Sequence, residues 1–307
     1  SSFYEALDAS GKVVFSSNII ESNGCREFFT TSAANASTEL QNKQVLIEEF
    51  TGIYCGNCPD AHEMIAELLK SQGDKINAIA IHAGPYADSD NPNYRTEYGE
   101  IYDEYFVPDG YPNGMVNRRH LVDGEIMLSR AYWVKCAKQI SQEIAPVNLW
   151  IGTQYDIETS TLTVNVEGYY TQDVENDFNM LNIAITQSGI VGPQNGGGSG
   201  GSYVHDHMAR AYLTPVWGDT IASCKKGDSF RKIYTYVVPK SINGVATDVF
   251  DFEILAYVCR DKEDVLNVLS SHVNLPADYR PLKARIEHPL IPVGGTYAYN
   301  YYEALLV

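Results

Sequence analysis

The sequence Val45-Leu46-Ile47-Glu48-Glu49-Phe50-Thr51-Gly52-Ile53-Tyr54-Cys55-Gly56-Asn57-Cys58-Pro59 joins an apolar run to the start of a helical pattern, with two cysteines at the junction. The apolar run predicts a strand, and Pro59 is a favoured residue in the first turn of a helix. At a helix start, backbone N–H groups and the helix dipole favour a thiolate on Cys55. Two thiols at this spacing can close a disulfide and reopen it by exchange, so the sequence predicts a dithiol redox site.

Two other interpretations of the cysteine pair stay open. A Cys-x-x-Cys pair can be half of a zinc site, which needs four ligands. The remaining cysteines form no second close pair, and this disfavours zinc: they are Cys25, Cys136, Cys224 and Cys259. The stronger alternative is a permanent disulfide on a scaffold without turnover, because a fold does not determine a function.

The flanking residues predict a sheet covered by helices on both faces. Apolar residues recur at helical spacing over 59–73, and 76–81 is a nearly continuous apolar run, as in a strand buried on both sides. A second helix is expected over 96–106, with its aromatic residues on one side. A third is expected from Ser129 to Ile144, with Cys136 on its apolar stripe as a buried small side chain.

After Pro146 the helical spacing gives way to runs with alternating, β-branched and aromatic residues, separated by turn residues. These runs predict strands at Leu149–Ile151, Leu162–Val166, Leu181–Ile185, Ile233–Val238 and Phe252–Val258. We therefore expect a short strand segment and linker over 1–40, an α/β domain over 41–145 and an all-β sandwich over 146–307. A disulfide between Cys224 and Cys259 is compatible with this arrangement, although sequence alone does not fix a pairing.

A glycine-rich segment, 196–201, interrupts the strands. It lacks the Gly-Lys-Ser/Thr ending of a phosphate-binding loop and is expected to be mobile. His205 and His207 follow it with Asp206 between them. Because no further ligand is identifiable and ordering a glycine-rich loop costs entropy, we expect them to bind no structural metal.

The composition excludes several classes of partner. The chain has 307 residues with 22 basic and 39 acidic ones, a net charge of −17, which disfavours nucleic acid and anionic membrane surfaces. No apolar run is long enough for a transmembrane span. No signal peptide is recognisable in the chain, which starts at Ser1, so a lipid anchor would lie upstream of it.

In this context the sequence resembles the thioredoxin superfamily, in which a Gly-x-Pro turn such as Gly110-Tyr111-Pro112 precedes an apolar strand. The resemblance implies that Pro112 is cis and lies against the dithiol, where the free backbone of the loop pairs with substrate. It also implies that Glu49 is a buried acid that relays a proton to Cys58, while its neighbour Glu48 points to the other face of the strand. Tyr54 replaces the usual tryptophan before the first cysteine.

From about Gln44 to the C-terminus, the chain is similar to the Omp28-related outer-membrane proteins of Bacteroidetes. The similarity is carried by the segment Glu49–Pro59, by Gly110-Tyr111-Pro112, and by Tyr203-Val204-His205-Asp206-His207 with Arg210 and Trp217-Gly218. It implies a cell-envelope protein, associated with the outer membrane as a lipoprotein and either periplasmic or surface-exposed. It implies little about biochemical activity.

Two functions follow as hypotheses. In the first, the protein is a thiol–disulfide oxidoreductase that acts on the thiols or disulfides of exported proteins. Cys55 would be the exposed, attacking sulfur, Cys58 would resolve, Glu49 would relay the proton, and Tyr54, Tyr111 and Pro112 would position substrate. No cofactor is expected beyond the Cys55–Cys58 disulfide, and the acidic neighbours predict a weak oxidant rather than a strong one. In the second, the protein is a surface scaffold for an unknown ligand, with a buried or irreducible pair.

Overall fold

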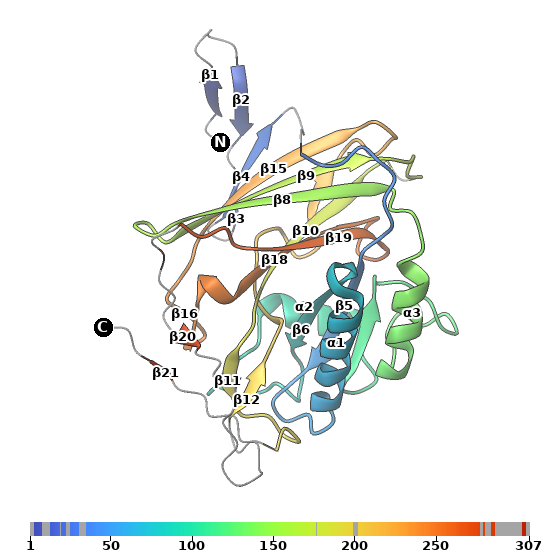
Figure 1. Ribbon diagram of the computed structural model, residues 1–307, viewed down its shortest axis with the longest axis vertical. Helices are drawn as coiled ribbons and strands as arrows, with labels where there is room; N and C mark the ends of the chain where they lie inside the picture. The colour runs from blue at the N-terminus through green and yellow to red at the C-terminus, as the bar shows by residue number, and fades with distance from the viewer. Residues whose placement is uncertain are drawn as a thin grey trace.

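The computed structural model describes residues 35–175, 177–198, 202–276 and 279, together with the backbone of six strand segments near the two ends (Figure 1). Those segments are β1 (Phe3–Leu7), β2 (Val13–Asn18), β3 (Ile20–Ser22), β4 (Cys25–Thr30), β20 (Ala284–Arg285) and β21 (Glu303–Ala304). The short strands expected within residues 1–40 are thus present. Part of the expected linker and the side chain of Cys25 lie outside the described residues.

One sheet of eight strands forms the centre of the molecule. Seven strands follow the order β19-β18-β10-β13-β6-β5-β7, and β14 pairs with β10 beside them. They are β5 (Val45–Thr51), β6 (Ile76–His82), β7 (Asn113–Val116), β10 (Asn179–Gln187), β13 (Met208–Tyr212), β14 (Asp219–Ile221), β18 (Phe252–Cys259) and β19 (Val265–His272). Three strands of this sheet, β5, β6 and β7, precede residue 146 in the sequence, and the others follow it. The predicted division at that residue does not coincide with a break between sheets, and the domain limits stay a prediction.

Helices cover both faces of the β5–β6–β7 part of this sheet, as predicted. Helices α1 (Cys58–Gln72) and α3 (Trp133–Ile140) pack on the face that carries Val45 and Ile47. Helix α2 (Glu97–Phe106) packs on the opposite face. Because side chains alternate along a strand, odd-numbered residues of β5 face α1 and even-numbered ones face α2.

A second sheet, of five strands, has the order β3-β4-β15-β9-β8 and contains β8 (Val147–Asp156), β9 (Thr161–Tyr170) and β15 (Ser229–Val237). Its apolar side chains share one core with those of β10, β18 and β19, so the two sheets pack face to face. The five strands predicted after Pro146 coincide with β8, β9, β10, β15 and β18. Among the described residues from 147 to 272 the only helix is a short 3-10 turn, η3 (Val249–Asp251). The fold is mixed α/β and dominated by sheets.

Local sequence signals explain most of the helix ends. Thr96 caps α2 by accepting a hydrogen bond from the N–H of Gly99, and the glycine that follows α1, Gly73, ends it with a positive φ of 56°. The third helix differs from its prediction. Residues Arg130–Tyr132 form a 3-10 turn, η2, and Ser129 makes no side-chain cap, so the α-helix starts only at Trp133.

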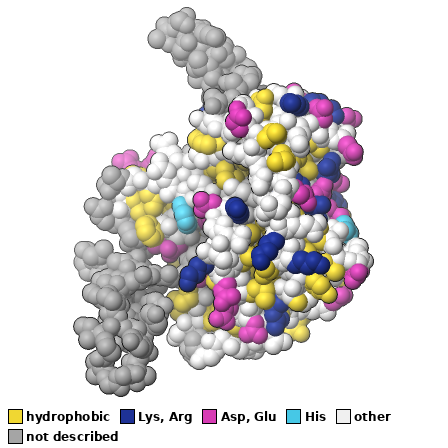
Figure 2. Space-filling model, turned by 45° about the vertical axis from the view of Figure 1, so that its right-hand side comes forward, with side chains coloured by type: hydrophobic (Ala, Val, Ile, Leu, Met, Phe, Trp, Pro, Cys, Tyr) yellow, Lys and Arg dark blue, Asp and Glu magenta, His cyan; other side chains and the backbone are white. Residues whose placement is uncertain are grey.

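The remaining short elements are η1 (Gly73–Lys75), the pair β11 (Ile190–Gly192) and β12 (Tyr203–His205), and the pair β16 (Ser241–Ile242) and β17 (Val245–Ala246). No helix among the described residues is long and apolar enough to cross a membrane. On the face shown in Figure 2, Lys and Arg side chains are interspersed with Asp and Glu, so the negative net charge does not gather there into one acidic field.

Candidate functional site

The two cysteines of the Cys-x-x-Cys pair form a disulfide at the carboxyl end of β5. A turn follows the strand, with the N–H of Cys55 donating to the carbonyl of Gly52 at 3.0 Å. Helix α1 then starts at Cys58, with Pro59 in its first turn. The pair therefore lies between strand and helix as the sequence predicts.

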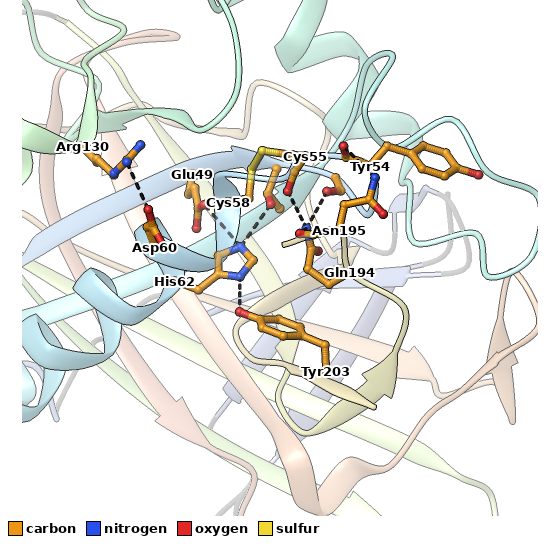
Figure 3. Close-up of a disulfide and its surroundings, with 12 residues drawn as sticks. Glu49, Tyr54, Cys55, Cys58, Asp60, His62, Arg130, Gln194, Asn195 and Tyr203 are labelled. Atoms are coloured by element: carbon orange, nitrogen blue, oxygen red, sulfur yellow. Dashed lines mark hydrogen bonds and ion pairs between the residues drawn. A yellow bond between two sulfur atoms is a disulfide. The ribbon is translucent and has the colours of Figure 1, made fainter. Parts of the chain in front are cut away.

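The expected exposure of Cys55 is wrong for the disulfide form. Cys55 is 1% exposed and Cys58 0%, so neither sulfur is presented to solvent. The reason is a segment far away in the sequence. Gln194 donates through Nε2 to the carbonyls of Gly52, at 3.1 Å, and Cys55, at 2.9 Å (Figure 3).

The next two residues of that segment, Asn195 and Gly196, also pack on the turn that carries the disulfide. The N–H of Asn195 donates to the carbonyl of Ile53 at 2.7 Å, and its side chain donates to the carbonyl of Tyr54 at 3.2 Å. Gly196 has a positive φ, and a Cβ there would lie 2.0 Å from the carbonyl oxygen of Gly56. The start of the glycine-rich segment therefore packs closely on the dithiol turn, whereas residues 199–201 lie outside the described residues.

Glu49 lies on the α1 face of β5, and Glu48 points to the opposite face, as expected for neighbours in a strand. Glu49 is fully buried, and neither carboxylate oxygen has a hydrogen bond. Its ion-pair partner is His62, whose Nε2 lies 3.3 Å from Oε1 (Figure 3). Glu48 instead receives two hydrogen bonds from the buried guanidinium of Arg118, at 2.7 and 2.6 Å.

Sequence reasoning missed His62. It lies one turn after Cys58 on α1, so both side chains share a helix face. Its Nε2 is also 3.1 Å from Thr51 Oγ1, and its Nδ1 is 2.7 Å from the hydroxyl of Tyr203. Burial alone would lower the pKa of His62, but the carboxylate of Glu49 outweighs it and the pKa is raised. The i, i+4 spacing from Cys58 was the available sequence signal.

A pocket of about 450 Å³ opens beside this group, between α1 and the segment that contains β12. Glu49, His62 and Tyr203 line it, and acidic side chains from α1 and the β12–β13 turn surround them: Asp60, Glu63 and Asp206. Asp60 has an ion pair with Arg130 at 3.4 Å (Figure 3).

The two histidines of the glycine-rich region do not form a metal cluster with their neighbours. Within the described residues, no group of three or more His, Cys, Asp or Glu is arranged to hold a metal ion. His207 lines the pocket, and its Nδ1 lies 3.7 Å from a carboxylate oxygen of Glu253. His205 packs against the rings of Tyr94 and Tyr203, and burial lowers its pKa to about 4. The absence of a structural metal stays a prediction.

The predicted substrate-positioning residues lie on the other side of the dithiol turn. The Tyr111–Pro112 bond is cis, as predicted, and β7 begins at the next residue, opposite Phe50. Tyr54 is 48% exposed, and its N–H donates to the carbonyl of Tyr86. The ring of Tyr86 lies 5.3 Å from that of Tyr111. Tyr54 and Tyr111 therefore both contact Tyr86, and neither lines the pocket.

The remaining described cysteines are free and buried, namely Cys136, Cys224 and Cys259. The disulfide considered between Cys224 and Cys259 is thus absent. Cys224 packs in the core between the two sheets, whereas Cys259 packs on the opposite face of the eight-stranded sheet, against the α2 side. Cys136 is a buried side chain in the core under α3, as predicted.

Comparison with solved structures gives several matches. HBP35 of Porphyromonas gingivalis has a similar fold and matches with a TM-score of 0.64 at 20% identity, over 85% of this chain and 86% of that one. A protein of Agrobacterium tumefaciens matches at 0.45 and 12% identity, over 81% and 99% of the two chains. A domain of the outer membrane lipoprotein Omp28 from P. gingivalis matches at 0.31 and 17% identity, over 43% and 92%.

Comparison with curated proteins finds no match. The model of one protein family, described as outer membrane protein Omp28, matches residues 100–276, which is more than half of the chain. The matched segment begins after the Cys55–Cys58 pair, so the match itself says nothing about the dithiol. The chain belongs to the Omp28 family of outer membrane proteins and is a protein of the cell envelope associated with the outer membrane.

Proposed function

We propose that this protein is a thiol–disulfide oxidoreductase whose Cys55–Cys58 disulfide exchanges with the thiols of exported proteins. The observation that carries the proposal is the carboxylate of Glu49. It is fully buried, without a hydrogen bond to either oxygen, on the strand that ends at the disulfide. A buried charge that lacks hydrogen bonds costs stability, and such groups gather at functional sites. A purely structural disulfide has no need of it.

The exchange is a pair of sulfur displacements. A substrate thiolate attacks Cys55 Sγ, the Cys55–Cys58 bond breaks, and the Cys58 thiolate leaves and takes a proton that Glu49 relays to it. A second substrate thiol then attacks the substrate sulfur of the mixed disulfide and releases Cys55. Two electrons pass from the substrate dithiol to the protein, and a disulfide-bearing partner protein of the envelope restores the Cys55–Cys58 bond. Each step reverses when the reduced protein meets a substrate disulfide.

The surrounding fold supports the proposal. Helix α1, which starts at Cys58, connects the parallel strands β5 and β6. The turn that contains cis-Pro112 precedes β7, which pairs with β5 in the antiparallel direction. This arrangement, with the fold similarity to HBP35, supports assigning residues 41–145 to the thioredoxin superfamily. We further propose that Tyr54, Tyr111 and Pro112 contact the substrate backbone. The protein would be a lipoprotein of a member of the Bacteroidetes.

One observation favours a second function. Both sulfurs are buried, and Gln194 is bonded to the carbonyl of Cys55, as expected for a scaffold that keeps a permanent disulfide. Under the first function, the segment that contains Gln194 must move before a thiolate can reach Cys55. Under the second, it never moves, and binding is carried by other surfaces.

A native reduction experiment separates the two functions. The folded protein is equilibrated in graded glutathione buffers, and alkylated thiols are mapped by mass spectrometry while circular dichroism monitors folding. We expect reversible reduction of Cys55 and Cys58 in the folded protein, and trapped mixed disulfides through Cys55 in Cys58→Ala. Cys136→Ala is the control, because it removes a buried thiol elsewhere. A pair that stays oxidised until the protein unfolds would establish the scaffold function instead.

Replacing Gln194 tests this contact directly. Gln194→Ala removes the hydrogen bonds to Gly52 and Cys55, so dithiothreitol should reduce the disulfide faster than in the wild type. Gln187→Ala provides the matched control, since this amide bonds the carbonyl of Ala246 instead. Equal rates in all three proteins would show that Gln194 does not limit access.

A further inference from the structure

The residues beneath the disulfide form a connected series that ends at the pocket. Glu49 Oε1 lies 3.3 Å from His62 Nε2, and His62 Nδ1 lies 2.7 Å from the Tyr203 hydroxyl (Figure 3). The three side chains come from β5, α1 and β12, and Tyr203 is 141 residues away from His62 in the sequence. The side chain of Glu49 is 1% exposed, whereas that of His62 is 17% exposed.

This geometry raises a problem that the proposed exchange must solve. Each reduction of the disulfide takes a proton from Glu49, and each reoxidation returns one. Glu49 borders the pocket, but its side chain is only 1% exposed and neither oxygen has a hydrogen bond, so direct exchange of that proton with solvent is poorly supported. Its one ion-pair partner among the described residues is His62, which lines the pocket.

We propose that His62 carries protons between Glu49 and solvent in the pocket, with Tyr203 holding its ring and passing the proton to Nδ1. The inference rests on the proposed function and deepens it, because it names the route by which Glu49 regains a proton after each reduction. It assigns a role to two residues that lie outside the Cys-x-x-Cys motif.

The proton steps balance. Burial and the nearby Glu49 raise the pKa of Tyr203 to about 12, so its hydroxyl is protonated at neutral pH and can donate to Nδ1. The neutral ring then carries its hydrogen on Nε2, facing Glu49. A solvent proton enters at Nδ1 through the Tyr203 hydroxyl while the Nε2 hydrogen passes to Glu49. The opposite half-reaction moves one proton back along the same groups and restores the first tautomer.

The charges around His62 suit this role. Glu49 faces it from β5, Tyr203 from β12, and Asp206 from the turn after β12, and both carboxylates raise its pKa against the opposing effect of burial. The imidazolium stage is therefore accessible near neutral pH, where a proton carrier works best.

The test measures how fast dithiothreitol reduces the disulfide between pH 5.5 and 9, in the full chain and in His62→Ala, His62→Gln and Tyr203→Phe. We expect His62→Ala to be slower by roughly tenfold or more at neutral pH, and Tyr203→Phe to show a smaller loss with a shifted pH profile. Added imidazole should restore the rate of His62→Ala in a concentration-dependent way. His120→Gln is the control, because this histidine also pairs with a carboxylate, Glu263, but is exposed.

The outcomes distinguish the inference from the function on which it rests. A wild-type disulfide that no thiol reduces under native conditions overturns the proposed function. A reducible disulfide with wild-type rates and pH profile in both His62 variants overturns only the proton route. Slow reduction of folded His62→Ala without rescue by imidazole would also overturn it, because a structural defect is not repaired by a free proton carrier.

Discussion

Two adjacent carboxylates of strand β5, Glu48 and Glu49, lie on opposite faces of the strand and differ in their hydrogen bonds. Glu48, on the α2 face, accepts two hydrogen bonds from Arg118, and this guanidinium also bonds the Tyr257 hydroxyl and the Lys262 carbonyl. Glu49, on the α1 face, is equally buried but has no hydrogen bond. A satisfied buried ion pair fixes one packing arrangement, whereas a buried carboxylate without hydrogen bonds costs stability and calls for an explanation. The contrast distinguishes an acid that is paired in the core from the acid to which the proposed exchange assigns a proton relay.

The largest expected effect comes from breaking the satisfied pair. Arg118→Met leaves Glu48 buried and uncompensated, because both side chains are 0% exposed. The free energy of unfolding should fall by about 3–5 kcal/mol, measured by urea denaturation. The double variant Arg118→Met/Glu48→Leu should recover much of this loss, since it removes both charges. A loss below about 1 kcal/mol in the single variant would contradict a structural role for the pair.

The second effect concerns His62, His82 and His205, which ring contacts with one another and with Tyr203 join into one group. The folded pKa of His205 is about 4, below the usual 6.5, because of burial. Between these values the unfolded chain binds more protons than the folded one, so stability falls as the pH falls from 6.5 towards 4. The loss should approach about 3 kcal/mol. His82 is shifted in the same direction. His62 has the opposite sign, because its raised pKa stabilises the fold at low pH and that contribution is lost as the pH rises through the raised value.

Urea denaturation at several pH values measures this loss. Replacing His205 by Phe keeps a ring beside Tyr94 and Tyr203 and removes the titrating group. The variant should therefore lose less stability than the wild type between pH 6.5 and 4. Identical slopes in the two proteins would mean that His205 is not the group that titrates.

Local patterns in the sequence predicted those features of the fold and site that depend on residues close together in the chain. The strand, turn and helix around Cys55 and Cys58, the cis-Pro112 turn and the opposite orientation of Glu48 and Glu49 follow from spacing, alternation and the thioredoxin resemblance. The disulfide could be expected on the same grounds, but its burial could not.

What the sequence did not predict depends on contacts between distant segments. Gln194 bonds the carbonyl of Cys55 across 139 positions, and Arg118 meets Glu48 across 70. Such contacts follow from how strands are ordered in the eight-stranded sheet, which places β13 between β6 and β10. Periodicity along a chain carries no information on that order. The contact of Gln194 with Cys55, the Arg118–Glu48 ion pair and the position of Tyr203 therefore cannot be predicted from the sequence pattern and are seen only in the structure.

The smallest and most specific prediction compares the two acids by the same substitution. Glu48→Gln weakens two charge-assisted hydrogen bonds and should lower the free energy of unfolding. Glu49→Gln removes a buried carboxylate without hydrogen bonds, and the relief of that cost offsets the loss of its ion pair with His62, so the free energy of unfolding should change by less than about 1 kcal/mol. The same variant removes the main influence that raises the pKa of His62, so NMR titration of that ring should show a lower pKa. Destabilisation of similar size by both substitutions would break the comparison, because Glu49 would then stabilise the fold in the same way as Glu48.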